Sequence, residues 1–328
     1  MFSFARIKAA ACPIIIGAVV GGLALFPGVT SASAQDTVRI ALPTKSYYPT
    51  IITEAATREK LFEKAGVKAE ATVYRSGAEA FEAVAAGAAD VTVGSTAIVA
   101  AGIRKGVKTK AFAAVSLGYN GWFLMVKSDS KIKNVSELEG KKVGITSAGS
   151  ASDILARWTM SEKKVHFTTA PLGGGGLVPN LLTGNVDAIV IYSPLSFKVM
   201  QDKGGRSLID YGAESPKHLS GVWIASEKMI KEKPELLQKL TNALVNATNY
   251  LHQHRDEAIK IIADVDDIPP KVAAAELDGN ILKLSTTGEM TKEWAQRGLD
   301  LAKLVGMTNL APVSEIYTTQ FTPVPKKH

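Results

Sequence analysis

Residues 76–96 read SGAEAFEAVAAGAADVTVGST, which contains a complete helix-turn-strand unit between two loops of small residues. Apolar residues recur at helical spacing up to Gly87, which predicts an amphipathic helix that ends at this glycine. An apolar strand follows at Asp90–Val93, and the loop Gly94–Thr96 leads into another helical run. The order helix, glycine, two residues, aspartate and strand recurs at residues 184–190, so two parts of the chain are predicted to share one plan.

The segments before this unit follow the same alternation. Val38–Leu42 reads as a strand, the loop Thr44–Tyr48 follows it, and a helix is predicted to start at Pro49 and to end at Gly66. A second strand at Glu70–Arg75 leads into the quoted stretch. Strands that each end in a small-residue loop before a helix are typical of a mostly parallel α/β sheet. Ligands of such sheets bind at the carboxyl ends of the strands, where these loops lie.

Residues 145–154 read ITSAGSASDI and place hydroxyl side chains between a predicted strand, Lys142–Ile145, and a helical run. Ser150 followed three residues later by Asp153 matches the capping-box pattern, with aspartate in place of the usual glutamate or glutamine. The backbone N–H groups and the dipole at such a helix start attract an anion. We therefore predict an anion-binding loop here, with an ordinary capped helix as the alternative interpretation.

The chain divides into two predicted lobes. It is expected to cross from the first lobe into the second near Gly118–Gly121 and to return between Pro216 and Trp223. From Pro234 onward the pattern is helical, and these helices are expected to support the first lobe. The predicted fold is α/β and two-lobed, each lobe a mostly parallel sheet flanked by helices, with lobe I formed by residues 35–119 and 217–328 and lobe II by residues 120–216.

Residues 1–34 have the features of an export signal. Arg6 and Lys8 precede the apolar stretch Ala9–Phe26, and Ala32–Ala34 supplies the small residues that a signal peptidase reads. We predict cleavage after Ala34 and a periplasmic mature protein, with an uncleaved membrane anchor as the alternative.

The 328-residue chain has a single cysteine, Cys12, which lies inside the predicted signal. The mature chain therefore lacks cysteine, which excludes disulfides, cysteine-ligated zinc and thiol catalysis. The formal net charge is +7, but its lysines and arginines are scattered and form no basic block interleaved with aromatic residues. Nucleic acid is therefore not an expected partner.

The sequence contains neither Gly-x-Ser-x-Gly nor His-Glu-x-x-His. Gly173–Gly176 is not followed by the Gly-Lys-Ser/Thr of a phosphate loop, which favours a flexible lead into a helix. His252 and His254 stand two positions apart without a carboxylate pattern, so we expect them on a solvated face. We predict no catalytic residue, no metal site and no cofactor.

Several aromatic residues lie near the predicted ligand edge. The rings of Tyr47, Tyr48 and Tyr192 could hold an organic ligand, with packing between loop and helix as the alternative. Trp122 and Trp223 also lie near predicted loops, and together these rings favour an organic anion over an inorganic one. Asp187 follows a Gly-Asn turn and is expected either to contact the ligand or to fix that turn.

The segments SGAEAFEAVAAGAADVTVGST, KNVSELEGKKVGITSAGS and GNVDAIVIYSP resemble the nitrate/sulfonate/taurine family of ABC-transporter substrate-binding proteins. The resemblance implies two hinged lobes that close around a solute and deliver it to a membrane permease and its ATPase. The positions that correspond to the family's ligand loops are Tyr47, Tyr48, Ser76, Gly77, Ser95, Thr96, Thr146, Ser147, Gly149, Ser150 and Tyr192. Many relatives have Trp-Pro near the last position, where this chain has Tyr192-Ser193-Pro194.

We therefore predict a monomeric periplasmic solute-binding protein, not an enzyme, that captures a sulfonate or carboxylate between its lobes. One alternative is binding of a thiamin-precursor pyrimidine, or pyrimidine synthesis by an enzyme of the same fold. The enzyme resembles this chain in fold but depends on a cysteine-rich motif that the mature chain lacks. A sensor domain is the other alternative, and it would need a DNA-binding or membrane-spanning segment that the mature sequence does not show.

Overall fold

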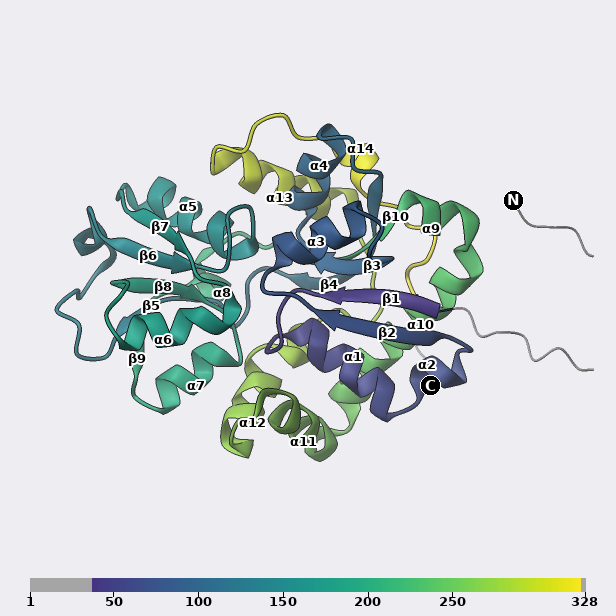
Figure 1. Ribbon diagram of the computed structural model, residues 1–328, viewed down its shortest axis with the longest axis horizontal. Coiled ribbons are helices and arrows are strands. Elements are labelled where there is room, and N and C mark those ends of the chain that lie inside the picture. Colours follow the sequence, from purple (N-terminus) through teal and green to yellow (C-terminus); the bar gives the residue numbers. More distant parts are fainter. Residues whose placement is uncertain (1–36, 326–328) are drawn as a thin grey trace, which may run out of the picture. The chain divides into compact units, whose positions relative to one another are not determined.

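The computed structural model describes residues 37–325, so the predicted export signal lies outside the described residues. The described residues contain two five-stranded sheets, with the strand orders β2-β1-β3-β10-β4 and β7-β6-β8-β5-β9 (Figure 1). The first sheet contains β1 (Thr37–Leu42), β2 (Lys68–Val73), β3 (Val91–Gly94), β4 (Thr109–Leu117) and β10 (Leu219–Ser226). The second contains β5 (Phe123–Lys127), β6 (Lys142–Ile145), β7 (Thr168–Pro171), β8 (Ala188–Ile191) and β9 (Gly205–Asp210). Each sheet with its helices is called a lobe below.

The two-lobed α/β prediction is confirmed, with the correction that both sheets are mixed. β1 pairs in parallel with β2 and β3, and β6 pairs in parallel with β7 and β8. β10 runs antiparallel between β3 and β4, and β5 runs antiparallel between β8 and β9. The reason is that β5 and β10 each follow a crossover between the lobes. Each of them therefore starts at the edge where the neighbouring parallel strands end.

Helices flank both sheets. Those of the first lobe are α1 (Tyr48–Arg58), α2 (Leu61–Lys64), α3 (Gly77–Ala85), α4 (Thr96–Arg104), α9 (Glu227–Glu232), α10 (Pro234–Gln253), α11 (Arg255–Asp266), α12 (Pro270–Gly279), α13 (Lys292–Leu304) and α14 (Val313–Ile316). Those of the second are α5 (Ala151–Lys163), α6 (Leu177–Leu182), α7 (Leu195–Gln201) and α8 (Tyr211–Glu214), and short 3-10 helices occur at η1 (Val135–Leu138), η2 (Gly174–Gly176) and η3 (Ile281–Lys283). Within the described residues, none of the helices has the length and apolar character needed to span a membrane.

The helix predicted from Pro49 to Gly66 is two helices in the structure. α1 ends at Arg58, and Lys60 adopts a left-handed conformation with φ 54° before α2 begins. This break redirects the chain so that Phe62 of α2 is only 5% exposed in the core of the first lobe.

The C-terminal helices pack mainly on the first lobe, as predicted. Leu240 of α10 and Ile262 of α11 share one core cluster with Ile40 of β1. α13 also contacts the second lobe, because Leu301 lies in the core cluster of the second sheet. The helical layer therefore touches both lobes.

The two crossovers lie side by side at the junction between the lobes. Gly118 and Gly121 of the first crossover have φ values of +79° and +75°, a conformation that favours glycine. The Gly118 N–H donates to the carbonyl oxygen of His218 in the second crossover at 2.9 Å. The lobes are thus joined by two hydrogen-bonded segments, and the carboxyl ends of the parallel strands in both sheets face the space between them.

Candidate functional site

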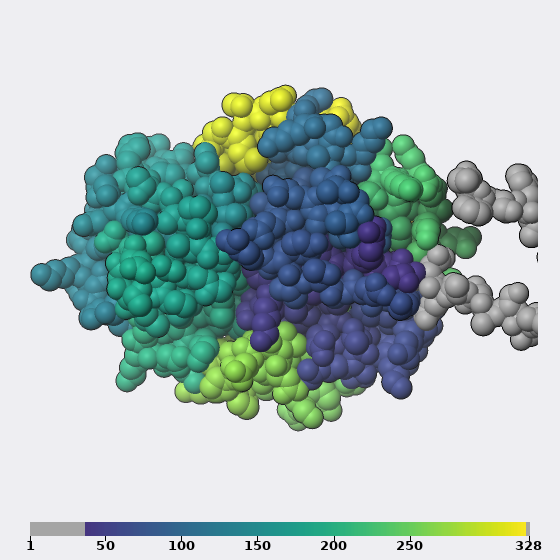
Figure 2. Space-filling view, viewed as in Figure 1, coloured from purple at the N-terminus to yellow at the C-terminus, as the bar shows by residue number. Residues whose placement is uncertain are grey.

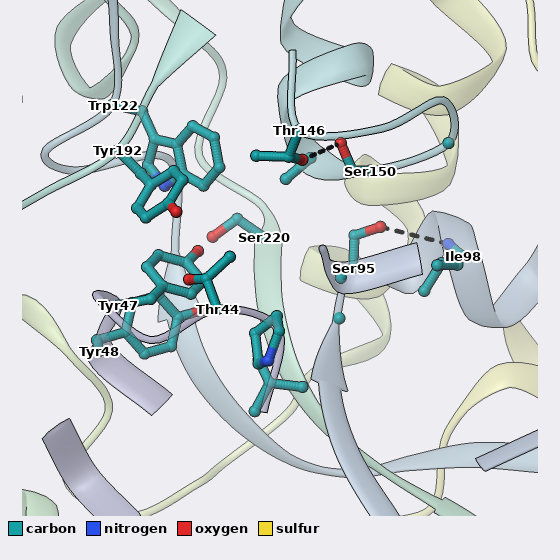
Figure 3. Close-up of a pocket in the computed structure, with 16 residues that line it drawn as sticks. Thr44, Tyr47, Tyr48, Ser95, Ile98, Trp122, Thr146, Ser150, Tyr192 and Ser220 are labelled. Carbon is teal, nitrogen blue, oxygen red and sulfur yellow. Dashed lines mark hydrogen bonds between the residues drawn. The ribbon is translucent and has the colours of Figure 1, made fainter. Parts of the chain in front are cut away.

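A pocket lies between the two lobes, at the strand edges that face each other (Figure 3). Its cavity has a volume of about 50 Å³. A water molecule needs roughly 10–15 Å³ measured in this way, so the cavity has room for a few waters or for one compact ligand. The lining residues are Pro43, Thr44, Tyr47, Tyr48, Gly77, Val93, Gly94, Ser95, Ile98, Trp122, Thr146, Gly149, Ser150, Ala151, Tyr192 and Ser220.

Aromatic rings from both lobes form one wall of the pocket. Tyr47 and Tyr48 follow β1 in the first lobe, whereas Trp122 and Tyr192 adjoin β5 and β8 in the second. The Tyr47 ring centroid lies 5.0 Å from that of Tyr192 and 5.8 Å from that of Trp122. Burial raises the pKa of Tyr47 well above its usual range and that of Tyr192 to about 12. These phenols therefore keep their protons at neutral pH, and each hydroxyl can donate to a ligand.

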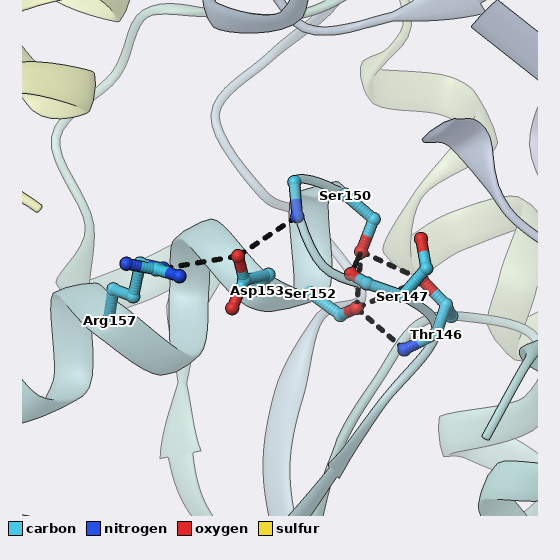
Figure 4. Close-up of polar contacts among 7 residues, drawn as sticks. Thr146, Ser147, Ser150, Ser152, Asp153 and Arg157 are labelled. Carbon is cyan, nitrogen blue, oxygen red and sulfur yellow. Dashed lines mark hydrogen bonds and ion pairs between the residues drawn. The ribbon is translucent and has the colours of Figure 1, made fainter. Parts of the chain in front are cut away.

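The loop between β6 and α5 forms a network of hydroxyl groups on the opposite wall (Figure 4). Thr146 Oγ1 donates to Ser150 Oγ at 2.8 Å, and Ser150 Oγ donates to the carbonyl oxygen of Ser147 at 2.8 Å. The Thr146 N–H donates to Ser152 Oγ at 2.9 Å. The network fixes the positions of Thr146 and Ser150, both of which line the pocket.

The predicted capping box does not form. Ser150 is the N-cap residue of α5, but its side chain accepts no helix N–H group. Asp153 Oδ2 instead accepts the Gly149 N–H at 2.9 Å and pairs with Arg157 Nε at 3.1 Å. The first-turn N–H groups of α5 thus have no side-chain acceptor, and Ala151, the first residue of this helix, lines the pocket. The positive end of a 13-residue helix therefore faces the cavity.

The first lobe contributes a second hydroxyl. Ser95 is the N-cap of α4, and its Oγ accepts the Ile98 N–H at 3.3 Å. Because a hydroxyl can accept and donate at once, the Ser95 O–H is still able to donate into the pocket. Gly77 also lines the pocket, at the start of α3.

Four of the predicted site residues do not line the pocket. Ser76 is fully buried and caps α3 by accepting the Glu79 N–H, and Thr96 Oγ1 donates to the Leu219 carbonyl at 3.4 Å. Ser147 belongs to the pocket loop, and its Oγ is buried without a hydrogen-bond partner. Asp187 lies just before β8, at the end away from the pocket, where its carboxylate accepts the Lys142 N–H at 2.9 Å. Of the two roles expected for Asp187, the structure supports fixing the turn.

Sequence reasoning missed two kinds of lining residue. Ser220 lies at the start of β10, and Ile98 lies in the first turn of α4. The signal for Ser220 would have been its place just after the second crossover, since that strand starts at the ligand edge. Trp223, which follows on the same strand, is buried in the core of the first lobe instead.

Among the described residues that line the pocket, none carries a carboxylate, amine, guanidinium or imidazole group. The site therefore offers hydroxyls, backbone N–H groups, a helix dipole and aromatic rings. In the described residues there is also no group of three or more side chains of the kinds that ligate metals.

Two buried carboxyl groups lie in the helical layer near this site. Glu276 of α12 is fully buried, and its Oε1 accepts from Asn280 Nδ2 at 2.8 Å. Asn280 Nδ2 also donates to Ser193 Oγ, next to Tyr192, at 3.0 Å. Burial raises the pKa of Glu276 to about 8, and burial likewise raises the pKa of Asp266 to about 7.

Comparison with known proteins places this geometry in context. A sequence model of the family described as NMT1/THI5 like matches residues 51–258. Over 228 residues the chain is 27% identical to a Bacillus subtilis (strain 168) protein assigned to aliphatic sulfonate binding. The matched region covers 69% of this chain and 67% of that protein. A shorter match, 29% identity over 83 residues, covers 25% of this chain and 22% of the 2'-hydroxybiphenyl-2-sulfinate desulfinase of Rhodococcus erythropolis.

The structure is similar to that of the alkanesulfonate-binding protein of Xanthomonas axonopodis pv. citri bound to MOPS. The TM-score is 0.74 at 19% sequence identity, and the similarity covers 86% of this chain and 98% of that one. At this level of identity the similarity shows the fold, which is the two-lobed fold of periplasmic binding proteins.

The raised pKa of Glu276 predicts a pH dependence of stability. The unfolded chain releases this proton near pH 4.5, whereas the folded protein holds it up to about pH 8. The contribution to the free energy of unfolding is therefore complete below pH 4.5 and is lost as the pH rises through about 8. Glu276→Gln should remove a few kcal/mol of this decline, measured by urea unfolding between pH 5 and pH 8.5.

Exposed Glu82 on α3 provides the matched control, and Glu82→Gln should leave the wild-type pH profile unchanged. Part of the decline should persist in Glu276→Gln, because Asp266 still loses its proton near pH 7. An identical slope in wild type and Glu276→Gln would contradict the assignment.

Proposed function

The chain belongs to the NMT1/THI5-like family, and we propose that it is the periplasmic solute-binding component of an ABC importer. In this role it captures a small organic anion, a sulfonate or a carboxylate, and delivers it to a permease and its ATPase. Relatives assigned to sulfonate binding, at 27% sequence identity in one case, support the class of ligand. The observation that carries the proposal is the uncapped start of α5, which faces an otherwise uncharged pocket between the lobes.

An anion in this pocket would be held without a cationic side chain. The first-turn N–H groups of α5 have no side-chain acceptor, and the dipole of a helix carries roughly half a positive charge at this end. The Ser95 hydroxyl lines the same cavity and can donate to the anion, whereas Thr146 and Ser150 already donate their hydroxyl protons within the loop. Hydrogen bonds to a charged group are about twice as strong as those between neutral groups, so a few donors suffice.

The lining also limits the class of organic anion. A ligand ammonium group would need a carboxylate partner, and the lining residues include none, which disfavours zwitterions such as taurine. A dianion would bury a second charge without a cationic partner, which disfavours sulfate. The aromatic wall of Tyr47, Trp122 and Tyr192 suits an apolar body. A monoanionic head on a compact apolar body therefore fits best.

The two crossovers are the hinge of this binding protein in our proposal. We place the lobe boundaries near residues 119 and 217, within the segments that connect the two sheets. Rotation about the hydrogen-bonded pair Gly118 and His218 would open the pocket to solvent. We further propose that residues 1–34 direct export to the periplasm and that the mature protein acts as a monomer.

Catalysis is the second function to consider, because part of the chain resembles a desulfinase. The lining residues include no carboxylate, imidazole or thiol that could move a proton or attack a substrate. The tyrosines keep their protons, since burial raises their pKa values. Binding is therefore favoured over catalysis. The pyrimidine alternative is not favoured either, because the relatives named above bind sulfonates.

A ligand panel tests the proposal directly. Residues 35–328 should gain thermal stability with methanesulfonate, ethanesulfonate, benzenesulfonate or benzoate, because a ligand at a hundredfold its Kd stabilises by about 2.7 kcal/mol. Taurine, sulfate and a pyrimidine should give no shift. A shift with cations or neutral solutes alone would contradict the proposal.

Ala151, the first residue of α5, allows the sign of the ligand charge to be tested. Aspartate at this position suits a helix start, so Ala151→Asp should leave the melting temperature of the free protein unchanged or slightly raised. It should weaken binding of the best sulfonate at least a hundredfold, since like charges about 4 Å apart repel by roughly 4 kcal/mol at an effective dielectric constant of 20.

Ala151→Asn has nearly the same shape without the charge and is the matched control. It should weaken binding less than tenfold in the same calorimetric titration. Equal affinities for the aspartate and asparagine variants would mean that the ligand head carries no negative charge near α5.

A further inference from the structure

The four glycines Gly173–Gly176 lie between β7 and α6 and connect the two lobes. Gly173 N–H donates to the carbonyl oxygen of Thr146, a pocket residue of the same lobe, at 2.9 Å. Gly174 N–H donates to the carbonyl oxygen of Arg75, in the loop between β2 and α3 of the first lobe, at 3.0 Å. A single short segment thus bonds to the pocket loop on one side and to the opposite lobe on the other.

Gly174 has no room for a side chain, because Tyr192 of its own lobe and Thr44 of the first lobe both lie against it. A Cβ atom on Gly174 would lie 2.3 Å from the Tyr192 hydroxyl and 2.8 Å from Thr44 Cγ2, and both of these residues line the pocket. A Cβ atom on Gly175 would have no atom within 4 Å. Neighbouring glycines in one run are therefore under different constraints.

A flexible lead into α6, the interpretation that the sequence favours, does not account for this difference. Flexibility would depend equally on Gly174 and Gly175, whereas the packing depends on Gly174 alone. Gly174 also lies between Thr44 of the first lobe and Tyr192 of the second. Figure 2 shows the teal surface of the second lobe meeting the blue surface of the first lobe along a seam.

We propose that Gly173–Gly176 is a clasp that closes the pocket over its ligand, and that Gly174 is its positioning residue. The inference rests on the proposed function, because it assumes a ligand that enters when the lobes open. The Gly174–Arg75 hydrogen bond and the packing against Thr44 join the two lobes, so opening must break them. A contact of this kind slows release of the ligand more than it affects capture.

In the first lobe the clasp bonds to the backbone carbonyl of Arg75. The Arg75 side chain is largely exposed, and its Nε lies 3.9 Å from Glu79 Oε1. Closure of the lobes therefore depends on main-chain geometry and on the fit of Gly174 between two pocket walls. A ligand too large for the cavity of about 50 Å³ would hold the lobes apart and prevent this fit. The clasp thus selects for ligand size as well as retaining the ligand.

Gly174→Ala and Gly175→Ala form a matched pair for the test. With the tightest-binding member of methanesulfonate, ethanesulfonate and benzenesulfonate as probe, stopped-flow kinetics should show dissociation from Gly174→Ala at least tenfold faster than from wild type. Association should change less than threefold. Gly175→Ala should match wild type in both rates and in the melting temperature of the free protein, whereas free Gly174→Ala should melt somewhat lower, because its Cβ also meets the Tyr192 hydroxyl within its own lobe.

Hydrogen exchange of the Gly174 amide in wild type gives a second readout that needs no variant. The probe sulfonate should slow this exchange at least tenfold, because closure forms the bond to Arg75. Equal dissociation rates for both alanine variants, or exchange unaffected by a bound probe, would overturn the clasp alone. Failure of wild type to bind any of these anions would overturn the proposed function first, and the clasp with it.

Discussion

The antiparallel insertion of one crossover strand into each sheet is the constraint on which the rest of the structure depends. β5 pairs on both sides within the second sheet, and β10 pairs on both sides within the first. Because each starts at the edge where the parallel strands end, the two crossovers lie at that edge and hold the ligand loops of both lobes opposite each other. A cleft then follows from the topology, and the loops decide what the cleft binds.

The pocket offers dipoles to an anion rather than charged side chains. A lysine or arginine would have to lose its hydration whenever the lobes close, which costs several kcal/mol. Hydroxyls, N–H groups and the start of α5 carry no full charge, so their loss of hydration on closure costs less. The arrangement suits a carrier that must release its ligand as well as bind it, and the Gly174 contact in our proposal adds retention through shape.

Much of this could be predicted from the sequence, because it depends on local patterns. The loops after the parallel strands were identifiable from their small residues, and Tyr47, Ser95 and Ser150 indeed line the pocket. The mixed sheets could not be predicted, since strand direction depends on where the chain crosses between lobes. Nor could side-chain direction: Thr96 adjoins Ser95 in the sequence yet bonds to β10. Gly174 is constrained by Thr44 and Tyr192, which are distant from it in the sequence. Ser150 donates to the Ser147 carbonyl instead of capping the helix, and the sequence pattern does not distinguish these two hydrogen bonds.

Closure of the lobes around an organic anion is the central claim, and a distance measurement tests it most directly. Residues 35–328 contain no cysteine, so Glu82→Cys on α3 and Glu162→Cys on α5 would carry the only two spin labels, one on each lobe. Pulsed electron paramagnetic resonance should show a broad distribution of distances between the two labels in the free protein and a single shorter distance with a saturating sulfonate. A distribution that stays the same while the sulfonate demonstrably binds would contradict the account.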